Sequence, residues 1–80
     1  MSQDFDQVPL RSEHGVTEGQ PVRLRESKEI AVVQYSEEGV SHPEMGRRHW
    51  HIHLLGGGLR WFSSAEEIKS ACIRLKAVRW

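Results

Sequence analysis

The sequence predicts a small α+β domain in which an antiparallel sheet of three to four strands is packed by one C-terminal helix, behind a disordered N-terminal tail. Residues 49–54 alternate histidine with an apolar side chain, which is typical of a strand with one buried face. Glycines at 56–58 follow it and suit a hairpin connection. Ser64 and Glu67 then form the Ser-x-x-Glu pattern that begins a helix.

The N-terminal part predicts a tail followed by two strands. Residues 1–20 are polar and show no sustained period, so we expect a flexible acidic tail there and a single domain over residues 21–80. Residues 21–25 alternate apolar and basic side chains, which predicts a short half-buried or edge strand. Residues 28–35 contain a β-branched run that ends in a tyrosine, which predicts a second strand.

The middle of the chain predicts a turn, a loop and a hairpin. Residues 36–39 suit a turn, and residues 39–46 contain a proline and two glycines, which favours a loop. The next strand is expected over residues 47–55, and residues 59–62 return as its antiparallel partner. The predicted core combines one row of the 28–35 strand with Trp50, Ile52 and Leu54.

One helix is expected over residues 65–78, because Ser64 can cap it and its charges complement the helix dipole at both ends. The stripe expected to face the sheet consists of Ile68, Ala71, Cys72, Leu75 and Val78. The opposite side carries an apolar strip that predicts contact with a protein partner or a second copy, formed by Ile73, Ala77 and Trp80. In the alternative interpretation, Trp80 folds back over the edge of its own domain.

Size and composition argue against several classes of function. A domain this small buries only about 60–65% of its unfolded surface, so an enclosed active site is not expected. The chain has neither a Gly-x-Ser-x-Gly elbow nor a Cys-x-x-Cys motif, and we expect no enzymatic activity and no cofactor. The single cysteine, Cys72, excludes an internal disulfide. Without a visible secretory signal or membrane span, the expected location is cytoplasmic, with no membrane partner.

The histidines of the 47–55 strand are a possible metal site. His49, His51 and His53 share one strand face, where successive imidazoles are about 6.6–6.8 Å apart along the chain. Two neighbours could therefore bind one ion, together with a third ligand from elsewhere. The candidates for this third ligand are His14, His42 and Glu44. The alternative is a polar row that faces solvent.

Charge is distributed unevenly along a chain whose formal net charge is zero. Residues 46–80 contain seven basic and two acidic residues, which indicates a possible anionic partner. A solvated basic face explains the same asymmetry. If the partner is a nucleic acid, a sheet face would contact it. The basic residues expected to do so are Arg47, Arg48, Arg60, Lys69 and Lys76.

The hairpin over residues 47–62, followed by Ser-Ser-Ala-Glu-Glu-Ile-Lys-Ser-Ala, is similar to two groups of DNA-binding proteins. These are the plant AP2-type domains and the arm-binding domains of tyrosine recombinases. The resemblance implies a three-stranded sheet that contacts DNA while a helix backs it. The first strand of this hairpin lacks the dense arginines of the plant domains, so the resemblance supplies no site residue.

The sequence therefore favours a small non-enzymatic interaction module that binds a protein partner or itself. Nucleic-acid binding through the sheet face is the alternative, and metal binding by the histidine row is a third. The neutral charge of the whole chain argues against strong non-specific binding to phosphates.

Overall fold

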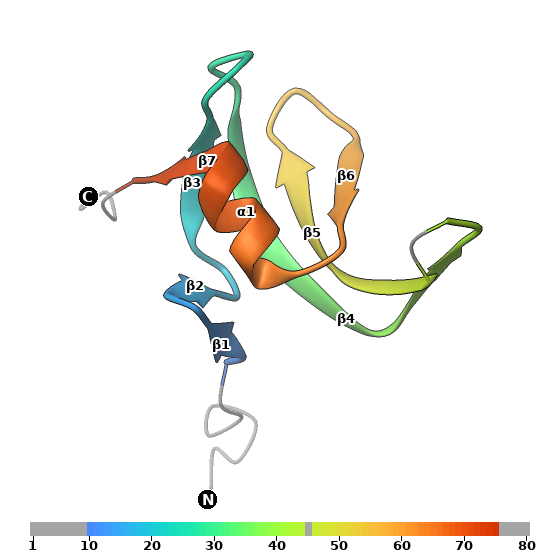
Figure 1. The fold of residues 1–80 in the computed structure, drawn as a ribbon. Helices are drawn as coiled ribbons and strands as arrows, with labels where there is room; N and C mark the ends of the chain where they lie inside the picture. The colour runs from blue at the N-terminus through green and yellow to red at the C-terminus, as the bar shows by residue number, and fades with distance from the viewer. Residues whose placement is uncertain (1–9, 45, 76–80) are drawn as a thin grey trace, which may run out of the picture.

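The computed structural model describes residues 10–44 and 46–75, which form two antiparallel sheets and one short helix (Figure 1). The larger sheet has five strands, in the order β6-β5-β4-β3-β7, so the prediction of three to four strands was too low. Its strands are β3 (Pro21–Leu24), β4 (Ile30–His42), β5 (Gly46–Leu54), β6 (Leu59–Phe62) and β7 (Cys72–Arg74). The smaller sheet pairs β1 (Ser12–Glu13) with β2 (Val16–Thr17), and the helix is α1 (Ala65–Ala71).

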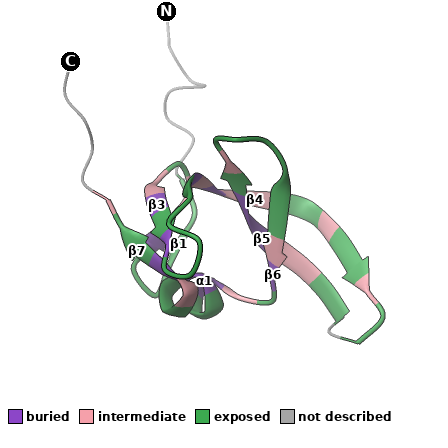
Figure 2. Ribbon diagram, turned by 90° about the horizontal axis from the view of Figure 1, so that it is seen from above, coloured by how far each residue is buried: buried purple, intermediate pink, exposed green. Residues whose placement is uncertain are grey.

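The core lies between α1 and one face of the five-stranded sheet. Trp50 and Ile52 are buried on this face, opposite Tyr35 and Val33 of β4, as the alternating pattern predicts. Leu54 packs partly against the same cluster. Figure 2 shows buried positions concentrated where the strands approach α1. The buried apolar residues are Val16, Val22, Leu24, Ala31, Val33, Trp50, Ile52, Phe62, Ala65, Ile68 and Cys72.

Helix α1 begins where the sequence predicts. Ser64 is the N-cap, and its hydroxyl accepts a hydrogen bond from the Glu67 backbone N–H at 3.3 Å. The Glu67 carboxylate accepts from the Ser63 backbone N–H at 2.8 Å, and this bond lowers the pKa of Glu67 below its usual value. The reciprocal capping contact thus reaches one residue further back than the standard capping box.

The helix ends at Ala71, so the prediction of a helix over residues 65–78 was wrong. Cys72 is already extended, and residues 72–74 form β7 beside β3. This pairing satisfies backbone groups along one side of β3 that would otherwise form an open sheet edge. Strand β3 is consequently an inner strand between β4 and β7, not an edge strand. Long-range pairing here outweighs the local helical period.

Strands β4 and β5 continue beyond the core as a projecting hairpin, which we call the arm and define as residues 36–44 and 46–48 (Figure 1). The predictions of a turn at 36–39 and a loop over 39–46 were wrong, since β4 runs to His42. A register shift between Tyr35 and Val40 accommodates the extra residues of β4. Such a bulge increases local bending, which lets the arm diverge from the sheet.

Part of the segment expected to be a flexible tail, residues 1–20, has regular structure: two short strands lie within residues 12–17. Strands β1 and β2 form a tight hairpin, and Val16 is buried against the core. His14 and Gly15 both have positive φ, of 53° and 81°, as a type I′ connection requires. The sequence signal for this turn is weak, because histidine stands where asparagine, aspartate or glycine is typical. The predicted boundary at residue 20 is not otherwise tested, and residues 1–9 lie outside the described residues.

Candidate interaction surface

The face of the five-stranded sheet opposite α1 carries no helix or strand among the residues that the structure describes (Figure 1). Paired residues in an antiparallel ladder share a face, so the register determines its members. One lateral row joins Ile73, Arg23 and Ile30, and the next joins Pro21, Val32, His53 and Leu59. A third row joins Gln34, His51 and Trp61. We call these ten residues the open face.

Large apolar side chains on the open face are accessible to solvent. Ile30 is 38% exposed, Ile73 43% and Leu59 50%. A hollow of about 280 Å³ lies next to them, lined by Val32, His53 and the end of β5. Single exposed hydrophobic residues are ordinary in proteins, but several large ones on one sheet face, here with Arg23 and His53 between them, are typical of an interaction site.

Arg23 is the only formally charged residue of the open face, which has no acidic residue. Within the described part of the chain, no carboxylate forms an ion pair with Arg23. Its neighbours across the strands are Ile73 and Ile30. The guanidinium is therefore available to a carboxylate of a binding partner.

His51 is the most enclosed polar side chain of the open face, with 7% of its surface exposed. Its ring packs on Trp61 at a centroid distance of 4.2 Å, and its Nε2–H donates to Oε1 of Gln34 at 3.2 Å. The second ring nitrogen, Nδ1, is buried without a hydrogen bond to any described residue. Burial lowers the pKa of His51, and the neighbouring His53 adds a smaller lowering contribution.

We expect His51 to make folding stability depend on pH. Because the native pKa is lowered from 6.5, the unfolded chain binds a proton first as pH falls. The free energy of unfolding should therefore decrease below pH 6.5, by at most about 1.4 kcal/mol per pH unit, until native His51 also becomes protonated. Denaturation of the His51→Gln variant between pH 7.5 and 5 should show a shallower decrease. His53→Gln, on the same strand, is the control, and an equal change in both variants would contradict this assignment.

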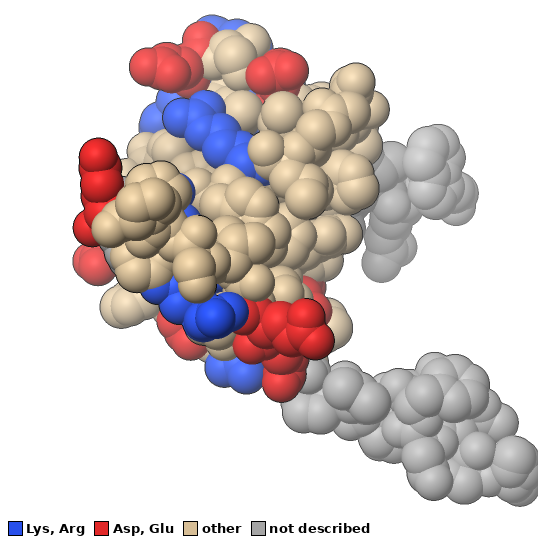
Figure 3. All heavy atoms as spheres, turned by 90° about the vertical axis from the view of Figure 1, so that its right-hand side faces the viewer, with Lys and Arg blue, Asp and Glu red and all other residues tan. Residues whose placement is uncertain are grey.

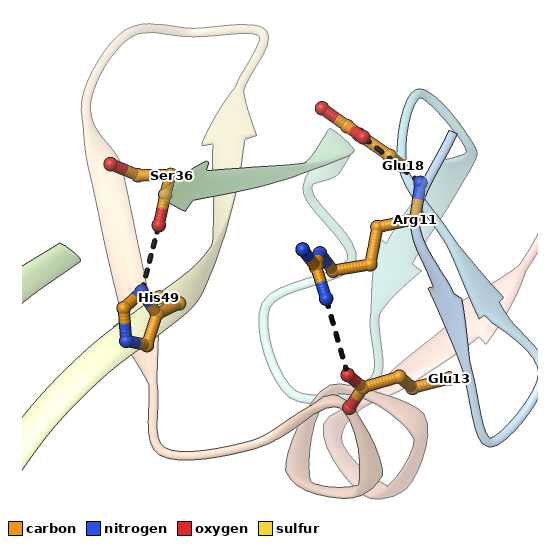
Figure 4. Close-up of polar contacts among 5 residues, drawn as sticks. All are labelled: Arg11, Glu13, Glu18, Ser36 and His49. Carbon is orange, nitrogen blue, oxygen red and sulfur yellow. Dashed lines mark hydrogen bonds and ion pairs between the residues drawn. The ribbon is translucent and has the colours of Figure 1, made fainter. Parts of the chain in front are cut away.

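The three histidines of β5, predicted as a metal site, have different surroundings in the structure. His51 is enclosed by Gln34 and Trp61, while His53 is exposed. The Nδ1–H of His49 donates to the Ser36 carbonyl oxygen at 2.9 Å (Figure 4). In residues 10–44 and 46–75, no group of three histidine, cysteine or carboxylate side chains could bind an ion, and this includes the predicted third ligands His14, His42 and Glu44.

His49 instead belongs to an aromatic cluster at the base of the arm. Its ring stacks on Tyr35 at a centroid distance of 5.4 Å, and Trp50 meets the same tyrosine edge-on. The guanidinium of Arg11 lies 4.0 Å from the Tyr35 ring centroid, a cation–π contact that joins the β1–β2 hairpin to the large sheet. Figure 4 shows Arg11 also held near the two glutamates that it contacts, Glu13 and Glu18. Contacts within the chain therefore explain the positions of the His49 ring and the Arg11 guanidinium without a bound ligand.

The basic residues predicted for nucleic-acid binding are dispersed. Arg47 and Arg48 lie on the arm, Arg60 lies over the Phe62 ring on the helix side of β6, and Lys69 lies on α1. Figure 3 shows basic and acidic side chains interspersed with uncharged surface on the side that it displays. The fifth residue, Lys76, lies outside the described residues. Nucleic-acid binding remains a prediction that this arrangement does not specifically favour.

The apolar strip predicted on the helix is only partly covered by the structure. Ile73 is exposed as predicted, but it lies on β7 and belongs to the open face. Ala77 and Trp80 lie outside the described residues. From the sequence we did not identify Ile30, Gln34 and Leu59 as residues of the same surface as Ile73. The alternation within residues 30–35 was a usable signal, because it places Ile30 and Gln34 on one face of that strand.

No helix of the described residues is long and apolar enough to cross a membrane. Comparisons of the chain with protein-family models, with curated proteins and with solved structures found no match.

Proposed function

We propose that this chain is a non-enzymatic interaction module that binds a protein partner through the open face of its sheet. The observation that carries the proposal is the exposure of Ile30, Leu59 and Ile73 on one face of the sheet. Full burial of a completely exposed side chain of this kind contributes about 1.5–3 kcal/mol, and because these three are 38–50% exposed, covering each would contribute about half of that or less. Covering this face would therefore supply a substantial part of the free energy of a specific complex.

Charge indicates what kind of partner fits. The open face combines apolar side chains with Arg23 and has no carboxylate. Two copies stacked through this face would bury two guanidinium groups without counter-charges, which is costly. A different protein with an apolar segment and a carboxylate opposite Arg23 satisfies both requirements. The proposal therefore commits to a heterologous partner that presents an apolar segment with an acidic residue.

Site-directed photocrosslinking tests this proposal. A photoreactive amino acid at Leu59 should yield an adduct with a discrete protein, whereas one at Leu10, which is exposed but outside the open face, should not. The partner is then identified by mass spectrometry, purified, and its affinity for the chain is measured. We expect Ile73→Ser to weaken binding about tenfold or more, as loss of a central apolar contact does.

The controls separate the apolar and ionic contributions. Val40→Ser removes an apolar side chain of similar exposure from the arm and should leave the affinity unchanged. Arg23→Gln should reduce both the affinity and its dependence on salt. An adduct consisting of two copies of the chain would overturn the heterologous partner. Unchanged affinity of Ile73→Ser would overturn the assignment of the surface.

A further inference from the structure

We propose that a cavity on the helix side of the sheet binds a small aliphatic carboxylate. The cavity has a volume of about 260 Å³ and lies between the β1–β2 turn, α1 and β7. It is separate from the open face, and the proposal does not depend on the function proposed for that face. Its lining includes an apolar floor and a basic rim, and the remaining lining residues are Gly15 and Gln20.

The floor is formed by four buried side chains from four elements: Val16, Val22, Ile68 and Cys72. None carries a formal charge, and burial raises the pKa of the Cys72 thiol, so that it stays neutral. Cys72 is therefore part of an apolar surface and not a nucleophile. These four side chains are 1–6% exposed, so a hydrocarbon chain would contact the small part of the floor that remains accessible, with no charged group to leave unpaired there.

The rim gathers three basic side chains that are distant in sequence: His14 from the β1–β2 turn, Lys69 from α1 and Arg74 from β7. No aspartate or glutamate of the described residues lines the cavity. Among the described residues, no carboxylate forms an ion pair with Lys69 or Arg74. An anionic group at the mouth of the cavity would accept hydrogen bonds from these donors. A carboxylate can accept them from both the ammonium group of Lys69 and the guanidinium group of Arg74.

The volume restricts the length of the ligand. Sites for drug-sized molecules have volumes of about 300–1,000 Å³, and this cavity lies just below that range. A short-chain or medium-chain carboxylate fits, whereas a membrane-lipid acyl chain would extend well beyond the floor. The ligand class that satisfies floor, rim and volume together is a carboxylate with a single short apolar tail.

Titration of the full chain with octanoate, below its micelle concentration, tests the proposal. Calorimetry should give a dissociation constant of about 1 mM or tighter, which corresponds to about 4 kcal/mol. Amide shifts in ¹H–¹⁵N spectra should be largest at Gly15, Val16 and Lys69, around the cavity. The uncharged analogue 1-octanol should bind about tenfold more weakly, because it cannot form a charge-assisted hydrogen bond with the rim.

Variants of the rim distinguish a specific site from general adsorption. The double variant Lys69→Gln and Arg74→Gln changes only exposed side chains and should weaken octanoate binding about tenfold. Lys28→Gln removes an exposed basic group outside the cavity and should leave binding unchanged. Equal affinity for octanol, equal affinity of the double variant, or shifts confined to the open face would each overturn the proposal.

Discussion

Replacing Ile68 with alanine should lower the free energy of unfolding by about 2–5 kcal/mol, as truncation of a buried isoleucine does. Ile68 is 1% exposed and is the only large apolar side chain of α1. It packs in the same core cluster as Val16 of β2 and Cys72 of β7. Its loss leaves a cavity where three elements meet. Chemical denaturation followed by tryptophan fluorescence measures the change.

Ile73→Ala is the matched control, because it makes the same chemical change five residues further along the chain. Ile73 is 43% exposed on β7, so its truncation should cost less than about 1 kcal/mol. The difference between the variants tests which isoleucine holds the C-terminal part of the chain to the core. Equal destabilisation by both would contradict the described packing of α1 and β7.

Replacing Gly39 with alanine should destabilise the arm. Gly39 has a φ of +66°, and a Cβ atom added there would lie 2.6 Å from the Arg48 carbonyl oxygen. A left-handed non-glycine residue costs about 1–2 kcal/mol, and an overpacked contact adds about 1–3 kcal/mol. Since the obstructing atom belongs to the backbone of the partner strand, relief requires the two strands to separate. We therefore expect local opening of the arm.

Amide hydrogen exchange measures this opening. In Gly39→Ala, protection should decrease for the arm amides of residues 40–42 and 46–48 and persist for Val33 and Ile52 in the core. Gly46→Ala is the control: Gly46 has a φ of +78° but no atom within 4 Å of an added Cβ. It should show only the cost of the backbone conformation, about 1–2 kcal/mol. Equal loss of protection in both variants would exclude the close approach to Arg48 as the cause.

Local patterns predicted much of the central hairpin and its core face. The alternation of histidine with Trp50, Ile52 and Leu54 identified the buried row, and the structure confirms it. The start of α1 was equally predictable, because Ser64 and Glu67 form their capping contacts within one turn. Period and capping depend on neighbours a few residues away, so a sequence records them directly.

Longer-range features were not predictable in the same way. Residues 36–42 have the composition of a turn, but they belong to β4, and residues 40–42 pair with β5 beyond the register shift. The β1–β2 hairpin depends on Val16 reaching a core built by much later residues. His51 has the alternation of a solvent-facing residue, yet Trp61 and Gln34 enclose it on the outer side of the sheet. Each outcome depends on partners distant in the chain.

The sequence by itself determined the α+β composition, the buried row of β5 and the first turn of α1. Only the tertiary structure decided where the helix ends, which strand completes the sheet and which surfaces remain open. The physical reason is competition at residues 72–74. A helical continuation would satisfy their backbone groups locally, whereas pairing with β3 satisfies those groups and the free side of β3 together. The need to pair the free side of β3 arises only in the folded sheet, so the local sequence does not reveal it. This pairing places Ile73 on the open face and Arg74 at the cavity.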